Sequence, residues 1–131
     1  MTRLRGYIFS RTFLGERAPQ HVQNIILRDY CAKRAFTFLL SATEYAMEGS
    51  SLMLNQIVEN LDDIDGIVAY SLFQLPENFE ERSRIILTML EKGKSFHFAV
   101  EGIVISDELT HQRCELLWKL KAADQHKLKD F

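Results

Sequence analysis

Short apolar runs alternate along this chain with longer segments in which apolar residues recur at helical spacing. A buried strand of a parallel sheet is typically a continuous apolar run, whereas a helix packed on a sheet shows a 3.6-residue period. This alternation predicts strand–helix–strand units joined by right-handed crossovers. The expected strands are residues 6–9, 36–40, 67–70, 96–100 and a short edge strand at 103–105, and the expected helices are 19–33, 52–61, 78–92 and 106–128.

We therefore predict a three-layer α/β fold with a mainly parallel, four- to five-stranded sheet. The expected strand order is the common doubly wound order 2-1-3-4(-5), and the fold ends in a long C-terminal helix. The length of 131 residues suits one domain, residues 1–131. Hydrophobic residues make up 47% of the chain, which is enough for a sizeable core and excludes a disordered chain.

The apolar runs are too short to cross a membrane, and the first residues lack the apolar stretch of a signal peptide. We therefore expect a cytoplasmic protein. Cys31 and Cys114 stand alone and far apart, so both are expected to be reduced packing residues. The chain has no GxGxxG, Walker, HExxH or GxSxG motif, and no cofactor or metal is expected.

The net charge of −2 is a cancellation between two unlike segments. Residues 36–81 contain acids but no Lys or Arg, whereas residues 1–35 are basic. A near-neutral total argues against nucleic acid as a partner, and the basic first quarter favours a small anion. The basic residues of this first quarter are Arg3, Arg5, Arg11, Arg17, Arg28, Lys33 and Arg34, against Glu16 and Asp29.

Polar side chains follow each expected parallel strand. Ligands of an open parallel sheet bind beyond the carboxyl ends of the strands, where the strand order reverses, here between strands one and three. The ligand-binding candidates at this rim are Arg11, Arg17, Gln20, Tyr45, Ser71 and Gln74. The candidates for catalysis are Glu101, Glu44, Ser10 and His21.

Arg11 and Arg17 precede a helix that is expected to begin at Pro19. Helix N-terminal amides carry partial positive charge, so the two arginines and these amides would form a seat for a phosphate or carboxylate. The alternative is that both arginines pair at the surface with the acidic segment 36–81, where such pairs contribute little energy.

The remaining candidates also have two interpretations each. Ser10 is either a nucleophile with His21 or Arg11 nearby, or a turn cap. Glu44 and Glu101 are either general acid/base groups or capping residues. His97 alternates with Phe96 and Phe98 on a strand, so we expect a hydrogen-bonded core histidine.

The last helix is rich in leucine, so its apolar face is expected to pack against another apolar surface. Its apolar residues either pack within one chain or also pair with a second copy in a symmetric dimer, with residues 106–128 as the dimerisation arm. These apolar residues are Leu109, Leu116, Leu117, Trp118, Leu120 and Leu128.

Five segments together resemble the small sporadic carbohydrate cluster proteins, and the resemblance covers almost the whole chain. That family occurs in bacterial gene clusters for lipopolysaccharide or other surface sugars, so the resemblance implies this setting without implying a reaction. The segments are RGYIFSR at 5–11, PQHVQN at 19–24, LSATEYAM at 40–47, DGIVAYSLFQLP at 65–76 and HFAVEG at 97–102.

The layout is also similar to the catalytic domain of serine recombinases, the resolvases and invertases. Gly6-Tyr7 leading to Ser10 resembles the first-strand motif that ends in their nucleophilic serine, and this likeness implies a resolvase-like fold and dimerisation. The catalytic arginines are missing. Phe73, Gln74 and Glu77 stand where that family has an Asp and two Arg, the 49–51 segment lacks its Arg-Pro pair, and Ile8 and Phe9 replace its first-strand Arg.

Attack of a serine on a phosphodiester needs guanidinium groups around the developing charge, so DNA cleavage is not expected. The leading hypothesis is a protein of surface-carbohydrate biosynthesis that binds, and in its stronger form transforms, an anionic sugar or sugar nucleotide at the rim. The alternative is a non-catalytic, dimerising interaction module with a recombinase-like fold.

Overall fold

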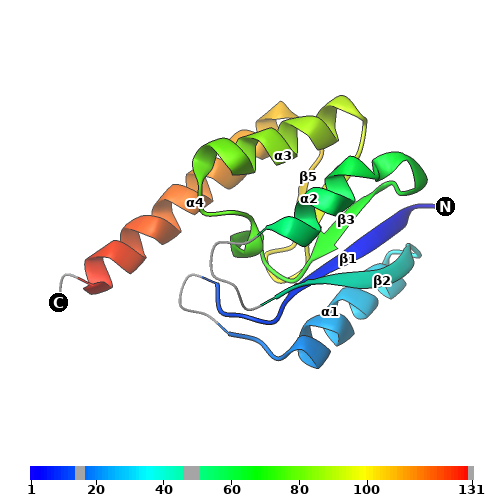
Figure 1. The fold of residues 1–131 in the computed structure, drawn as a ribbon, viewed down its shortest axis with the longest axis horizontal. Helices are drawn as coiled ribbons and strands as arrows, with labels where there is room; N and C mark the ends of the chain where they lie inside the picture. The colour runs from blue at the N-terminus through cyan, green and yellow to red at the C-terminus, as the bar shows by residue number, and fades with distance from the viewer. Residues whose placement is uncertain (14–16, 46–50, 130–131) are drawn as a thin grey trace.

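A computed structural model gives the fold of the chain and describes residues 1–13, 17–45 and 51–129 (Figure 1). Its helices and strands alternate as predicted. The strands are β1 (Arg3–Phe9), β2 (Thr37–Glu44), β3 (Gly66–Ala69), β4 (Ser95–Phe98) and β5 (Ile103–Ile105). The α-helices are α1 (Gln20–Lys33), α2 (Leu52–Glu59), α3 (Phe79–Glu91) and α4 (Glu108–Lys129), with short 3-10 helices η1 (Leu61–Asp63) and η2 (Leu72–Gln74).

The five strands form one sheet in the order β2-β1-β3-β4-β5. All neighbouring pairs are parallel except β4 and β5, which are antiparallel. The predicted α/β fold class and strand order are therefore confirmed. The point where the strand order reverses lies between β1 and β3, as expected.

The sheet is covered by helices on both faces, which gives three layers (Figure 1). Side chains alternate along β1: Leu4 and Ile8 pack toward α1, whereas Tyr7 and Phe9 pack toward α2, α3 and α4. Among the described residues, α1 therefore covers one face, and α2, α3 and α4 cover the other. The last turns of α4 extend beyond the rest of the fold (Figure 1).

β2 is longer than the sequence indicated. It was expected at 36–40, but it continues to Glu44 because β1 pairs with it on both sides of a register shift at Gly6, with Phe9 opposite Glu44. Polar residues after Leu40 gave a loop-like pattern, yet an edge strand tolerates them because one of its sides is unpaired. Glu44 is therefore the last residue of β2 and not a loop residue beyond it.

Two further boundaries differ from expectation. β4 ends at Phe98 because residues 99–102 turn back into β5, with Gly102 at a φ of 66° donating its N–H to the Phe98 carbonyl. α4 begins at Glu108 and not at 106, because Asp107 caps it: the Asp107 carboxylate accepts the Thr110 N–H at 2.8 Å. This bond also lowers the pKa of Asp107.

The helix over 19–33 is confirmed as α1, but its inward face holds Gln23, Leu27, Tyr30 and Cys31. Ile25, an apolar residue of the same helix, is 63% exposed. Periodicity alone placed the helix correctly, while its rotation about its own axis depended on the sheet beneath it.

His97 is buried on the α1 face of the sheet, as predicted. Its Nδ1 lies 2.7 Å from the Tyr30 hydroxyl and its Nε2 lies 2.8 Å from the Ser95 hydroxyl. Burial, and secondarily the positive charge of Arg34, lower its pKa from 6.5 to about 4. The neutral imidazole is therefore the form that the fold accommodates.

Cys31 and Cys114 are both free and buried, which confirms that they are packing residues. Within the part of the chain that the structure describes, no helix is both long enough and apolar enough to span a membrane.

Candidate functional site

The rim at the carboxyl ends of β1 and β2 is closed by contacts between the two strand ends. The Ser10 hydroxyl donates to the Glu44 carbonyl at 3.0 Å, and the Ser10 N–H donates to the same oxygen at 2.9 Å. Next to it, Arg11 Nη1 donates to the Tyr45 carbonyl at 3.1 Å, and its guanidinium lies 4.4 Å from the centre of the Phe9 ring. Ser10 and Arg11 therefore tie β1 to β2.

The carboxylate of Glu44 is buried and points to the start of α2. It accepts the Tyr7 hydroxyl at 2.7 Å and the backbone N–H groups of Met53 and Leu54 at 3.0 and 3.2 Å. Burial, and then the neighbouring negative charge of Glu44, raise the pKa of Tyr7 far above its ordinary value, so its phenol remains a donor. A carboxylate at this place stabilises the N-terminus of α2.

A second group of contacts joins α1 to the ends of β1 and β3. The Gln23 amide exchanges two hydrogen bonds with the backbone of Phe9, at 3.0 and 2.8 Å, and also donates to the Ala18 carbonyl. Its oxygen accepts a further bond from the Gln74 amide at 2.8 Å. Gln74 in turn accepts the Ser71 N–H.

Glu101 continues this set of contacts from the turn after β4. Its two carboxylate oxygens accept the Ser71 hydroxyl and the Leu72 N–H, each at 2.8 Å. Leu72 is also held from the opposite side, since its carbonyl accepts the indole N–H of Trp118 at 3.2 Å. The β3–η2 connection is thus bonded to the turn after β4, to α1 and to α4.

An aromatic side chain fills the crevice between β1 and β3. Phe13 is buried and packs edge-to-face on Phe9 and Tyr70, with ring centroids 5.9 and 6.1 Å apart. The position where an open sheet of this kind usually receives a ligand is therefore occupied by the chain itself.

The other predicted residues lie on the surface around the start of α1. Arg17, Gln20 and His21 are exposed, and so is Tyr45 at the end of β2. α1 begins without a side-chain cap and without an acidic residue in its first turn. The structure thus separates the ten candidates into an internally bonded set (Ser10, Glu44, Ser71, Gln74, Glu101), Arg11 beside it, and an exposed set (Arg17, Gln20, His21, Tyr45).

The sequence did not predict the importance of Gln23, the residue that organises the rim. A glutamine between Val22 and Asn24 has no signal of its own in one sequence. Only the packing of α1 on the sheet shows that this amide lies against the end of β1, where it satisfies backbone groups that would otherwise be buried without partners.

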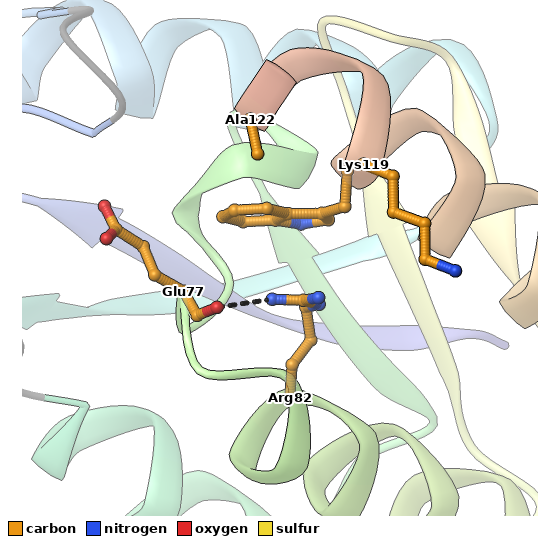
Figure 2. Close-up of a pocket in the computed structure, with 5 residues that line it drawn as sticks. Glu77, Arg82, Lys119 and Ala122 are labelled. Atoms are coloured by element: carbon orange, nitrogen blue, oxygen red, sulfur yellow. Dashed lines mark hydrogen bonds between the residues drawn. The ribbon is translucent and has the colours of Figure 1, made fainter. Parts of the chain in front are cut away.

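A small hollow of about 240 Å³ lies between the loop before α3 and helix α4. Glu77, Arg82, Trp118, Lys119 and Ala122 line it. Figure 2 shows Arg82 pointing from α3 to the backbone carbonyl of Glu77, with Lys119 and Ala122 above on α4. The Arg82 guanidinium lies 4.3 Å from the Trp118 ring and bonds to both carboxylate oxygens of Glu115. These contacts attach α4 to the rest of the fold.

Among the described residues, no group of three or more His, Cys, Asp or Glu side chains is arranged to hold a metal ion.

No protein-family model matches the chain, and no curated protein matches it. Solved structures do. The N-terminal catalytic domain of TP901-1 integrase is 16% identical, with a TM-score of 0.63, and the match covers 96% of this chain and 97% of that one. A resolvase family site-specific recombinase from Streptococcus pneumoniae is 12% identical, with a TM-score of 0.66, and the match covers 96% and 93%. At these identities the likeness shows a shared, resolvase-like fold, and activity must be argued from the site.

Proposed function

We propose that this chain is a non-catalytic interaction module that has a resolvase-like fold and assembles with itself through α4. The observation that carries the proposal is the outer face of α4. Leu109, Leu116 and Leu120 are 55%, 60% and 58% exposed there, whereas Cys114 and Trp118 on the inner face are buried. A row of exposed leucines on one helix face typically marks an interaction surface.

The inner face of α4 supports the same proposal because it holds the helix in a defined position. The ion pair between Arg82 and Glu115 and the bond from Trp118 to Leu72 attach α4 to the rest of the fold. A partner that binds the outer face would therefore meet a preformed helix and lose little conformational entropy on binding.

The contacts around Ser10 favour a role without DNA cleavage. Its hydroxyl is bonded to the Glu44 carbonyl, and the side chains at two positions where the recombinases carry arginine are Gln74 and Glu77. Gln74 is buried and bonded to Gln23. Stabilisation of a pentavalent phosphate would require positive groups at these places. In a nicking assay on supercoiled plasmid, we expect no cleavage that is lost in Ser10→Ala; cleavage that depends on Ser10 would contradict this part of the proposal.

The self-assembly is tested by light scattering on the full chain. We expect the mass of a dimer for the wild-type protein and of a monomer for Leu116→Asp combined with Leu120→Asp, with an unchanged circular dichroism spectrum. Ile25→Asp is the matched control, because Ile25 is equally exposed but lies on α1, on the other side of the sheet. A monomeric wild-type protein would overturn the proposal.

A second candidate function rests on the exposed polar residues at the start of α1. Arg17, Gln20 and His21 are exposed there, and α1 begins without a side-chain cap, which suits a phosphate or carboxylate. Together with the resemblance to sporadic carbohydrate cluster proteins, this favours binding of an anionic sugar or sugar nucleotide in surface-carbohydrate biosynthesis. Because Glu44 and Glu101 accept structural hydrogen bonds, we propose binding and not catalysis here.

The ligand hypothesis is tested by thermal shift with UDP-glucose and with inorganic phosphate. We expect a stabilisation that Arg17→Ala abolishes and that Arg28→Ala, an exposed arginine further along α1, retains. If neither compound shifts the melting temperature, or if both variants respond as the wild type does, this second function is excluded for these ligands.

A further inference from the structure

We propose that two copies of this chain pair their α4 helices antiparallel, so that Arg113 of each copy faces Ala123 and Asp124 of the other. This inference rests on the proposed self-assembly through α4 and specifies its geometry. It concerns only residues 109–124 of the helix, which lie on one continuous, described stretch.

Five exposed residues of α4, Leu109, Arg113, Leu116, Leu120 and Ala123, follow a coiled-coil repeat. Positions 109, 113, 116, 120 and 123 are separated by four, three, four and three residues, which is the spacing of a and d positions in a heptad. At about 100° per residue, these positions form one stripe, and it lies opposite the buried face at Cys114 and Trp118. A helix with this stripe pairs best with another helix that carries the same repeat, and a second copy supplies one.

Arg113 decides between the two possible directions of the partner helix. In a parallel pair in register, the two Arg113 side chains would meet each other within the seam, and two like charges at a partly buried position repel. Arg113 is exposed in the single chain, and its positive charge contributes to lowering the pKa of Asp107. Nothing in a parallel seam would neutralise the pair.

An antiparallel pair avoids this repulsion. With the two-fold axis near residue 118, Leu116 of each copy packs on Leu120 of the other, and Arg113 lies opposite Ala123, whose small side chain leaves room for it. Asp124 follows Ala123, is exposed, and offers a carboxylate to the same guanidinium. Because the two-fold axis repeats every contact, two leucine layers are flanked by an Arg113–Asp124 pair at each end.

The rest of the fold permits this arrangement. The stripe points away from the buried side of α4, so the two sheets would lie on opposite sides of the helix pair. The C-terminal turns of α4 already extend beyond the other elements (Figure 1). This leaves the C-terminal part of the stripe open to a partner helix.

Cysteine cross-linking of the full chain tests the direction. Arg113→Cys combined with Ala123→Cys places two thiols opposite each other in the antiparallel pair, whereas Arg113→Cys alone brings thiols together only in a parallel pair. Under mild oxidation, we expect a covalent dimer from the double variant and none from the single variant. The wild-type protein measures the background, which should be low because Cys31 and Cys114 are buried.

The other outcomes of the cross-linking experiment each contradict a specific part of the proposal. A covalent dimer from Arg113→Cys alone would overturn the antiparallel pairing in favour of the parallel one. If neither variant cross-links, light scattering on the same samples separates the two levels: a dimeric mass contradicts only the antiparallel seam, and a monomeric wild type contradicts the self-assembly itself.

Charge reversal provides an independent check. Arg113→Asp and Asp124→Arg should each weaken the dimer, raising its dissociation constant on the order of tenfold, because each creates like-charged neighbours across the interface. The double reversal should restore the wild-type value. If the double variant is as weak as either single variant, Arg113 and Asp124 do not pair across the interface.

Discussion

Arg82 and Glu115 form a bidentate ion pair between α3 and α4, with guanidinium nitrogens 2.7 and 2.8 Å from the two carboxylate oxygens. The Arg82 side chain is 5% exposed and that of Glu115 is 13% exposed. The remaining donors of Arg82 reach the carbonyls of Pro76 and Glu77. This pair is the polar anchor of the helix through which we propose that the protein assembles.

Glu115→Ala should destabilise the protein by about 3–5 kcal/mol, because it leaves a buried guanidinium without its anion. Urea denaturation at one protein concentration measures the change. Gln112→Ala, an exposed position on the same helix, is the control and should change stability by no more than about 0.5 kcal/mol. A loss below about 1 kcal/mol for Glu115→Ala would mean that water replaces the carboxylate.

Gln23→Ala should cost about 2–4 kcal/mol. The substitution leaves the N–H and carbonyl of Phe9 and the amide of Gln74 without their partner in a buried place. Chemical denaturation of this variant is compared with Gln20→Ala, which lies on the exposed side of α1 and should be nearly neutral. Equal stability of the two variants would show that the rim contacts contribute nothing to the fold.

Stability should fall as the pH is lowered from about 6.5 to about 4 because of His97. The unfolded chain takes up a proton near the ordinary pKa of 6.5, whereas folded His97 does so only near 4, so acid favours the unfolded state by up to about 3 kcal/mol across this window. Above pH 6.5 the imidazole is neutral in both states and the effect vanishes.

The measurement is the free energy of unfolding as a function of pH for the wild-type protein and two histidine variants. All three proteins share the same carboxylates, so the difference between their profiles isolates the contribution of the histidine. His97→Gln should flatten the profile between pH 6.5 and 4, and His21→Gln, which changes an exposed histidine, should leave it as it is. An unchanged slope in His97→Gln would contradict the assignment to His97.

Gly66→Ala should destabilise the fold by about 3 kcal/mol. A Cβ at this position would clash with the Ser95 carbonyl oxygen, which is backbone of the neighbouring strand and cannot move away without disturbing the sheet. At Gly93, by contrast, φ is +71° and the space is open, so Gly93→Ala should cost only about 1–2 kcal/mol of backbone strain. Thermal unfolding of both variants measures the two losses of stability. A larger loss for Gly93→Ala than for Gly66→Ala would contradict the prediction.

Most of the secondary structure was predictable because it depends on local pattern. Continuous apolar runs such as Ile67–Ala69 lie on strands buried from both sides, and helical spacing located α1, α3 and α4. The end of β2 was not predictable in this way. Residues 41–44 are polar and resemble a loop, and they belong to the strand because β1 continues beside them.

In the candidate site, too, the positions of the residues were predictable from the sequence and their contacts were not. Chain order places Glu44, Ser71 and Glu101 near the carboxyl edge of the sheet, and the structure finds them there. Their partners could not be predicted, because Tyr7 and Glu44 are 37 residues apart and Ser71 and Glu101 are 30 apart. Such contacts depend on the register between strands and on the rotation of helices, which no short segment contains.

The sequence by itself therefore determined the α/β architecture, its strand order and the place of Glu44, Ser71 and Glu101 near the carboxyl edge of the sheet, because the period of apolar residues and the handedness of crossovers are local properties. The tertiary structure alone decided how those residues are used. It turns the Glu44 and Glu101 carboxylates to backbone amides, fills the crevice with Phe13, and leaves Leu109, Leu116 and Leu120 of α4 exposed. The physical reason is that a polar group meets its partner, and an apolar face its cover, only after distant segments have packed together.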